Sequence, residues 1–269
     1  MIPKTIHYCW FGPNQKPELL LQCINSWKEH CPDYQIIEWN ESNFDINLCD
    51  FTRQAYEQKK YAFVSDVARL WVVYHYGGHY LDTDVELKQS LDVFSEYRGW
   101  MAADSIWVIN TGLGFGSEKG APHIKCMLDY YYTVPYQEQI CVNVNTKELK
   151  AYNPTLNIFN TTRVVDGHLF IAYTDYGKYA THYYTATWKD GDVNKRIENI
   201  ANNKNKRSLW KELRWKLIVA VRRPKLVRYI QTHNNLLCKI LHALVFDLVD
   251  CGFIFCIKAA FRKLFRRKK

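Results

Sequence analysis

The order of hydrophobic and polar residues predicts the elements of the first half of the chain. Thr5–Phe11 and Tyr34–Trp39 are runs of β-branched and aromatic residues, which are typical of strands, and Gly12-Pro13 marks a turn after the first run. Within residues 61–76, large apolar side chains return at steps of three and four, which predicts a helix that ends at Gly77-Gly78.

Further segments continue this alternation of strand and helix. They are a helix from Pro17 to about Cys31-Pro32, a short strand His79–Asp82, strand-like runs Trp100–Asp104 and Leu113–Phe115, and a helix over Ala121–Tyr132. Alternation of this kind predicts an α/β fold with a parallel sheet. In such sheets ligands bind beyond the carboxyl ends of the strands, which places Trp10 and Asp82 at the same edge. The stretch 140–190 has no clear period, and we expect an irregular lid or acceptor-binding region there.

The charges divide the 269 residues into two unequal parts. The formal net charge is +9, yet residues 204–269 contain 18 Lys or Arg against 3 Asp or Glu, whereas residues 1–203 contain 18 against 24. We therefore expect a mildly acidic catalytic domain over 1–203 and a basic amphipathic helical extension over 204–269. A basic extension favours an anionic partner, either lipid headgroups or nucleic acid.

The apolar residues of the extension favour a membrane surface over nucleic acid. Trp, Leu, Ile and Phe recur among Lys and Arg, as in helices that lie in the membrane interface. The apolar stretch Ile240–Ile257 contains Asp247 and Asp250, so we expect it to lie on the membrane rather than to cross it. The basic residues that would face anionic lipid include Lys258, Arg262, Lys263 and Arg266–Lys269. Nothing in 1–203 resembles a nucleic-acid-binding module, and we expect no nucleic-acid partner.

The cysteines and the start of the chain indicate a cytoplasmic protein. The nine Cys are scattered without a CxxC pair, which is typical of reduced thiols rather than of disulfides or zinc sites. Met1-Ile2-Pro3-Lys4 leads directly into the first strand, so no signal peptide is predicted. With the basic extension, this predicts a peripheral protein on the inner face of a bacterial plasma membrane.

The strongest local motif is the pair of aspartates in Gly77-Gly78-His79-Tyr80-Leu81-Asp82-Thr83-Asp84. In an extended segment, residues i and i+2 point to the same side, so Asp82 and Asp84 would present two carboxylates to one cation. Mg²⁺ and Mn²⁺ prefer oxygen ligands and often share them with substrate phosphates. The alternative is a solvated turn in which the two carboxylates only cap backbone groups.

A second pair of charged residues lies on the preceding helix. Asp66 and Arg69 are three residues apart and therefore share a helix face, where apolar neighbours surround them. Asp66 could accept hydrogen bonds from sugar hydroxyls, while the guanidinium of Arg69 could donate several hydrogen bonds. The alternative is a surface ion pair of small energetic value.

Three segments together resemble a known family. Ile2–Gly12, then Ser65-Asp66 with Arg69, then Gly77-Gly78 with Asp82-Thr83-Asp84, are similar in order and spacing to the DXD-containing sugar transferases of glycosyltransferase family 32. That family includes bacterial capsular and surface-polysaccharide transferases and relatives of an initiating α-1,6-mannosyltransferase. Its catalytic region is similar to that of the large clostridial glucosylating toxins. The resemblance covers residues 1–120 and implies a GT-A fold, a nucleotide-sugar donor, Mn²⁺ or Mg²⁺, and retention of anomeric configuration.

The resemblance also implies roles for individual residues. Trp10 would stack on the nucleotide base, and Asp66 and Arg69 would hold the donor sugar. Asp82 would contact ribose, sugar and metal-bound water, and Asp84 would bind the metal. Tyr80, beside these aspartates, is placed with the nucleotide-sugar-binding residues.

Two later segments extend the predicted site. Ala180-Thr181-His182 and Thr187-Trp188 resemble the family's Ala-x-His and Ser-Trp elements, with Thr in place of Ser, and imply that His182 and Trp188 lie near the metal and diphosphate. A packed core His and Trp are the alternative. The glycine-containing loop Asn110–Gly116 is predicted to line the sugar pocket, with Asn110 and Asp104 as candidate sugar-binding groups or simple turn caps.

These observations predict a metal-dependent retaining glycosyltransferase. It would move a hexose from a nucleotide diphosphate sugar, a UDP-sugar in preference to GDP-mannose, to a lipid-linked or polysaccharide acceptor in surface glycan synthesis. The first alternative is a metal-dependent phosphohydrolase, which needs further acidic ligands, and only Asp66 and Glu86 are near in sequence. The second alternative is a non-catalytic protein that binds sugar or membrane.

Overall fold

The structure is a computed structural model that describes residues 1–103, 108–154, 156 and 161–185. Each strand and helix predicted up to residue 132 is present, although the strand predicted at Leu113 begins only at Phe115. The elements are β1 (Thr5–Cys9), α1 (Glu18–His30), β2 (Gln35–Trp39), α2 (Asp50–Glu57), α3 (Tyr61–Tyr76), β3 (Gly78–Tyr80), β4 (Val85–Leu87), a 3₁₀ turn η1 (Leu91–Phe94), β5 (Gly99–Ala102), β6 (Phe115–Ser117), α4 (Pro122–Thr133), α5 (Cys141–Tyr152), β7 (Arg163–Val165), β8 (His168–Ile171), α6 (Tyr173–Tyr176) and β9 (Ala180–His182).

Seven of these strands form one mixed sheet in the order β2-β1-β3-β6-β5-β8-β7. β1 is parallel to β2 and β3, and β5 is parallel to β8, whereas β6 runs antiparallel between β3 and β5. β4 and β9 pair separately in an antiparallel ribbon. The predicted α/β fold is confirmed, with a sheet that is parallel only in part.

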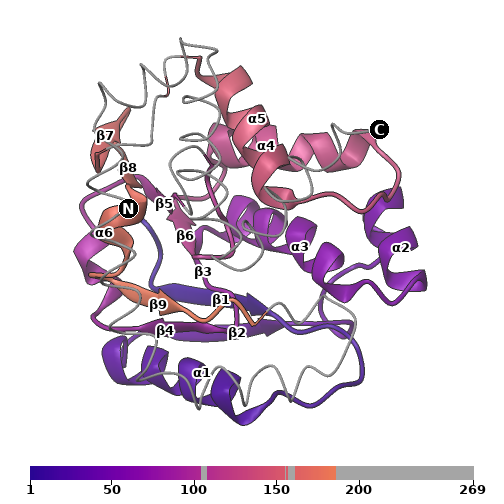
Figure 1. The fold of residues 1–269 in the computed structure, drawn as a ribbon, viewed down its shortest axis with the longest axis horizontal. Helices are drawn as coiled ribbons and strands as arrows, with labels where there is room; N and C mark the ends of the chain where they lie inside the picture. The colour runs from indigo at the N-terminus through magenta and orange to yellow at the C-terminus, as the bar shows by residue number, and fades with distance from the viewer. Residues whose placement is uncertain (104–107, 155, 157–160, 186–269) are drawn as a thin grey trace, which may run out of the picture. The chain divides into compact units, whose positions relative to one another are not determined.

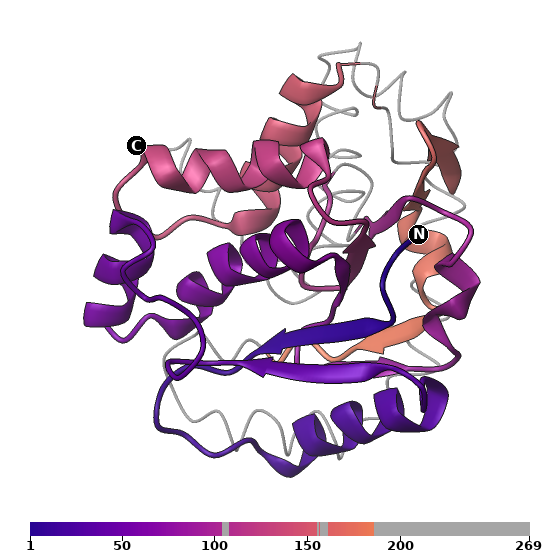
Figure 2. The same cartoon turned by 180° about the vertical axis from the view of Figure 1, so that it is seen from behind.

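Alternate residues of each central strand enter two different cores. Ile6 and Tyr8 of β1 pack in one core with Trp27 of α1, while Cys9 packs in the other core with Val67 of α3. This is the period of two that a strand buried on both faces requires. Figures 1 and 2 show the result from opposite sides: α1 covers one face of the sheet, and α3 and α4 cover the other.

The expectation of an irregular stretch over 140–190 is wrong for its described residues. α5, β7, β8, α6 and β9 lie there, and β8 adds a parallel strand to the main sheet. The signal that was missed is Asp166-Gly167: both residues have positive φ, 49° and 77°, as a two-residue type I′ hairpin between β7 and β8 requires. β7 and β8 have only three and four residues, which is too short for alternation of polar and apolar positions to predict a strand.

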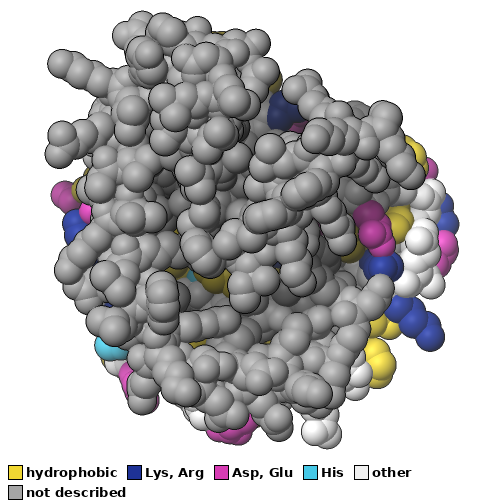
Figure 3. Space-filling model, in the orientation of Figure 1, with side chains coloured by type: hydrophobic (Ala, Val, Ile, Leu, Met, Phe, Trp, Pro, Cys, Tyr) yellow, Lys and Arg dark blue, Asp and Glu magenta, His cyan; other side chains and the backbone are white. Residues whose placement is uncertain are grey.

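Charged side chains on the described surface are mixed rather than segregated by sign. On α2, Arg53 pairs with Asp50 at 2.8 Å and with Glu57 at 3.0 Å. Figure 3 shows acidic and basic side chains side by side at the edge of the molecule where Figure 1 places α2. Among the described helices, none has the length and apolar character needed to cross a membrane. The predicted domain boundary at 203/204 and the whole basic extension lie outside the described residues.

Two buried histidines connect the strands to neighbouring tryptophans. His7 is 1% exposed; its Nε2–H donates to the carbonyl of Gly77 at 2.9 Å, and its Nδ1 accepts from the indole of Trp39 at 3.0 Å. His79 accepts from the indole of Trp100 in the same way, at 2.9 Å. Burial lowers the pKa of His7 to about 4 and that of His79 to about 3. Both rings are therefore neutral in the folded protein near neutral pH.

This arrangement predicts that acid destabilises the fold at unusually mild pH. In the unfolded chain the imidazole of His7 binds a proton below about pH 6.5, whereas in the native protein it does so only below about pH 4. The free energy of unfolding therefore falls as the pH is lowered through this window. The loss is about 3 kcal/mol for His7 alone, at about 1.4 kcal/mol for each pKa unit. Urea unfolding at pH 7.0 and 4.5 measures it. His7→Gln should flatten this dependence, whereas His30→Gln, at the partly exposed end of α1, should not; equal slopes in all three proteins would contradict the prediction.

Candidate active site around the DXD turn

Asp82 and Asp84 lie in a turn rather than in an extended segment. β3 ends at Tyr80, and the backbone N–H of Val85 donates to the carbonyl of Asp82 at 3.0 Å. The prediction that strand alternation places the two carboxylates on the same side is therefore wrong. The turn nevertheless brings them together: residues 81–84 connect β3 to β4, and a carboxylate oxygen of Asp82 lies within 4.8 Å of one of Asp84.

The antiparallel β4–β9 ribbon brings His182 to the two aspartates. Val85 of β4 pairs with His182 of β9, and His182 Nε2 lies 3.0 Å from Asp84 Oδ1. One ligand atom from each of Asp82, Asp84 and His182 falls within 4.8 Å of the others. The prediction that these three side chains share one site is met by the geometry, although their roles are not tested by it.

Asp84 is held as a buried carboxylate. Its other oxygen, Oδ2, accepts from Thr185 twice, from the backbone N–H at 2.9 Å and from Oγ1 at 2.8 Å. Burial acts to raise the pKa of Asp84, but His182 and the Thr185 donors outweigh it and lower this pKa to about 2. Asp84 is consequently ionised near neutral pH, as a ligand for a divalent cation must be.

Asp66 and Arg69, both buried, form a charged cluster beside the turn with the partly exposed Asp82. Arg69, 5% exposed, contacts Asp66 at 3.0 Å and Asp82 at 3.3 Å, and Tyr80 donates its hydroxyl to Asp82 at 3.0 Å. The alternative of a surface ion pair is therefore excluded. Burial raises the pKa of Asp66 to about 6, and it also raises the pKa of Asp82, while Arg69 opposes both shifts. Arg69 thus connects the predicted sugar-binding residue to the DXD turn.

Gly112 is a site residue that the sequence identified only as part of a glycine-containing loop. Its backbone N–H donates to Asn110 Oδ1 at 2.8 Å, and its α-carbon lies so near the turn that an added Cβ would be 2.5 Å from Asp82 Oδ2. Asn110 is therefore placed near Asp82 through Gly112. Thr185 was missed entirely, because it follows Asp84 by about a hundred residues and only the β4–β9 pairing brings it close.

Trp10 lies at the same edge of the sheet as the DXD turn, as predicted. β1 and β3 are parallel with His7 opposite Tyr80, so Trp10 and Asp82 both follow the carboxyl ends of neighbouring strands. The indole of Trp10 donates to the carbonyl of Asn14 at 2.7 Å, and the ammonium of Lys16 lies 5.5 Å from its ring. Trp188, Thr187 and Asp104 lie outside the described residues, and their predicted positions stay predictions.

The donor set at the turn fits a hard or borderline divalent cation. Two carboxylates and one imidazole converge, and one of the carboxylates is buried and ionised. Mn²⁺ and Mg²⁺ accept such oxygen ligands, and Mn²⁺ also accepts imidazole nitrogen. Asp84 and His182 would hold the ion directly, and Asp82 would complete its protein ligands.

Comparison with known proteins gives a family model and several relatives that are similar to this chain. Residues 17–101 match the family model described as a glycosyltransferase sugar-binding region containing DXD motif. Two curated relatives come from Schizosaccharomyces pombe: inositol phosphoceramide mannosyltransferase 3 is 32% identical over 46% of this chain and 35% of its own length, and inositol phosphoceramide mannosyltransferase 2 is 29% identical over 60% and 44%. The chain thus spans less than half the length of these relatives.

Two solved structures resemble the chain in part. They are the PaToxG glycosyltransferase, with a TM-score of 0.47 and 19% identity over 58% of this chain and 72% of that one, and a glycosyltransferase involved in glycosylation of the major capsid of PBCV-1, with a TM-score of 0.37 and 14% identity over 73% and 98%. The sequence match carries more weight, because it contains Asp66, Arg69, Asp82 and Asp84. Residues 17–101, which include Asp66, Arg69 and the DXD turn, are thus similar in sequence to the glycosyltransferase sugar-binding region containing DXD motif.

Proposed function

We propose that the chain transfers a hexose from a nucleotide diphosphate sugar to a hydroxyl group, with retention of configuration. The observation that carries this proposal is the convergence of Asp82, Asp84 and His182 on one point, with buried Arg69 joining that point to Asp66. A cation-binding cluster next to a carboxylate–guanidinium pair suits a substrate with a diphosphate at one end and a sugar at the other.

The residues of the chain divide the work in this proposal. Arg69 offers its guanidinium to the donor sugar and at the same time fixes the carboxylates of Asp66 and Asp82. Asp66, ionised above about pH 6, accepts hydrogen bonds from sugar hydroxyls. Trp10 stacks on the nucleotide base at the same sheet edge. A divalent cation, when bound, neutralises the charge that develops on the departing diphosphate.

The cation requirement and the donor are tested together. Purified protein is incubated with UDP-glucose, UDP-galactose or GDP-mannose, and slow donor hydrolysis is followed with and without Mn²⁺. GDP-mannose belongs in the panel because the relatives are named mannosyltransferases. We expect release of a free nucleoside diphosphate from one donor, lost on addition of EDTA and restored by excess Mn²⁺. Absence of turnover with every donor of an enlarged panel would contradict the proposal.

The same experiment separates the proposal from the phosphohydrolase alternative. A hydrolase of the two-metal type needs a second set of acidic ligands. Among the described residues, Asp82, Asp84 and His182 form the only cluster of three possible metal ligands. Asp66 is already paired with Arg69. Release of orthophosphate instead of a nucleoside diphosphate would favour the hydrolase.

We further propose that residues 204–269 attach the enzyme to the inner face of a bacterial plasma membrane, where the acceptor is a lipid-linked or polysaccharide glycan. The support is the excess of basic residues there, 18 against 3 acidic ones, together with the large apolar residues among them. Deleting 204–269 should move the protein from the membrane fraction to the supernatant. A truncated protein that still sediments with anionic vesicles would contradict this attachment.

A further inference from the structure

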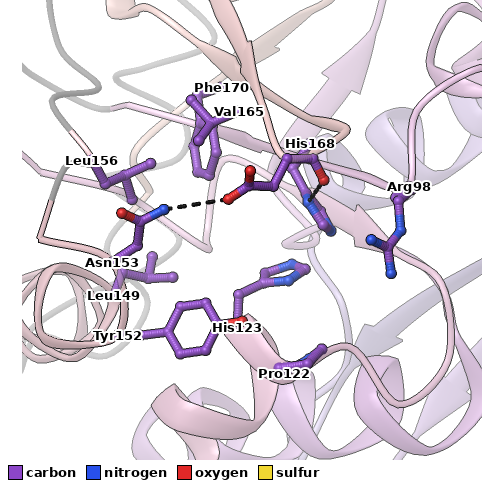
Figure 4. A pocket seen from close by; sticks show the side chains of 11 residues that line it. Arg98, Pro122, His123, Leu149, Tyr152, Asn153, Leu156, Val165, His168 and Phe170 are labelled. Atoms are coloured by element: carbon purple, nitrogen blue, oxygen red, sulfur yellow. Dashed lines mark hydrogen bonds between the residues drawn. The ribbon is translucent and has the colours of Figure 1, made fainter.

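A cavity lies at the opposite end of the sheet from the DXD turn. It has a volume of about 120 Å³, and Figure 4 shows the side chains that line it. His168, which begins β8, pairs with Gly99 at the start of β5, whereas Tyr80, next to the DXD turn, is level with Met101 near the end of β5. The cavity is therefore separate from the candidate active site.

Two imidazole nitrogens in this cavity have no hydrogen-bond partner among the described residues. They are Nε2 of His123, a residue only 7% exposed, and Nε2 of His168. The ring of His168 donates from Nδ1 to the carbonyl of Asp166 at 2.9 Å, so its Nε2 carries a lone pair. Burial lowers the pKa of both rings, that of His123 to about 3, and both are neutral near pH 7. A buried polar atom without a partner is costly, which favours a ligand or water at this place.

The cavity has more room and more apolar wall than buried water requires. One water needs about 10–15 Å³ measured in this way, and a cavity of about 120 Å³ holds several. Tyr152, which is 52% exposed, and Phe170 contribute aromatic walls. An apolar wall with a few convergent polar groups is typical of a small-molecule site.

The charges around the cavity favour a neutral ligand. Arg98 is already neutralised by Glu118, with Nε donating to the carboxylate at 2.8 Å, and Asp166 adds a negative charge. A phosphate or a carboxylate would meet neutral imidazoles and a net negative surrounding, and the described residues that line the cavity offer no unpaired cation to bind it. Hydroxyl groups, by contrast, both donate to and accept from imidazole nitrogen.

We propose that this cavity binds one neutral sugar unit of a glycan, whose hydroxyls hydrogen-bond His123 and His168 and whose ring packs against Tyr152. A pyranose ring presents an apolar face to an aromatic side chain and hydroxyls around its edge, which matches the wall and the unpartnered nitrogens. The site would hold a glycan at a distance from the DXD turn. This proposal does not depend on the transfer reaction.

Binding of methyl glycosides of glucose, mannose and galactose to the full chain provides the test. Saturation-transfer NMR detects contact, and calorimetry measures affinity. We expect one glycoside to bind and its affinity to fall about 10-fold or more in His123→Phe, the loss that one hydrogen bond accounts for. Phe fills the space of the imidazole and removes the unpartnered nitrogen, so this variant should fold. Tyr152→Ala, on the exposed rim, is a second variant with the same expectation, and His30→Gln is the control.

Two reciprocal variants keep this site distinguishable from the active site. Asp66→Asn should lose donor turnover and keep glycoside binding, whereas His123→Phe should keep donor turnover and bind the glycoside about 10-fold or more weakly. Glycoside binding that is unchanged in both cavity variants, or absent from the unmodified protein, overturns the proposal. Binding of Zn²⁺ alone that depends on His123 and His168, without any glycoside binding, also overturns it and assigns the two nitrogens to a metal.

Discussion

Asp84→Asn is expected to reduce donor turnover by at least about 100-fold, because it removes the charge of a proposed direct metal ligand, and even the partners of metal ligands cost about 10–100-fold when they are changed. Asn keeps the shape of the side chain and can still accept from Thr185, so the turn should stay folded. The apparent affinity for Mn²⁺, measured from the Mn²⁺ dependence of donor hydrolysis, should weaken in parallel.

Asp129→Asn is the matched control for this change. Asp129 pairs with Lys125 on the exposed surface of α4, at 2.7 Å, and has no part in the site. It should retain turnover and Mn²⁺ dependence. If Asp84→Asn kept activity within about three-fold of the unmodified protein, a difference of less than about 0.7 kcal/mol in transition-state stabilisation, the role assigned to the DXD turn would be wrong.

Gly112→Ala is expected to lower kcat by about 10–100-fold while the protein stays folded, because a displacement of about 1 Å in a catalytic constellation can cost about 100-fold. The new Cβ would lie 2.5 Å from Asp82 Oδ2, which is too close for a stable contact, and 3.0 Å from Asn110 Oδ1, which is a tight one. Gly112 is not among the glycines with positive φ, so backbone strain adds nothing to the effect. The carboxylate of Asp82 must therefore move away from its place beside Arg69.

Gly177→Ala makes the same chemical change where there is room for it. No heavy atom lies within 4 Å of a Cβ at Gly177, which ends α6 with an αR backbone. Its activity and thermal unfolding should match those of the unmodified protein. Full activity in Gly112→Ala would show that Asp82 is not held where the structure places it, or that its position does not matter to the reaction.

The long α3 and the strands β1 and β2 could be predicted because their signals are local. Residues 61–76 carry apolar side chains at helical spacing and end at a glycine with positive φ, and this helix appears with the predicted bounds. The β7–β8 hairpin carried only its Asp-Gly turn as a local signal, and strands of three and four residues are too short to show a period. Their place in the sheet is decided by pairing with β5, which lies far away in the sequence.

The candidate site likewise contains contacts that could be predicted from the sequence and contacts that could not. The pairing of Asp66 with Arg69 follows from their spacing on one helix, and the position of Trp10 at the edge of Asp82 follows from the order of parallel strands. The contact of Asp84 with Thr185 has no trace in the sequence, because it exists only through the β4–β9 ribbon.

By itself, the sequence determined the α/β alternation, the helix that carries Asp66 and Arg69, and the DXD motif, because each depends on residues close together in the chain. Only the tertiary structure decided that the motif is a turn, that Thr185 and Gly112 approach its carboxylates, and that the Arg69 pair is buried. These properties depend on strand pairing and on exclusion of water. Both depend on contacts between segments that lie far apart in the chain, and local sequence patterns do not predict such contacts.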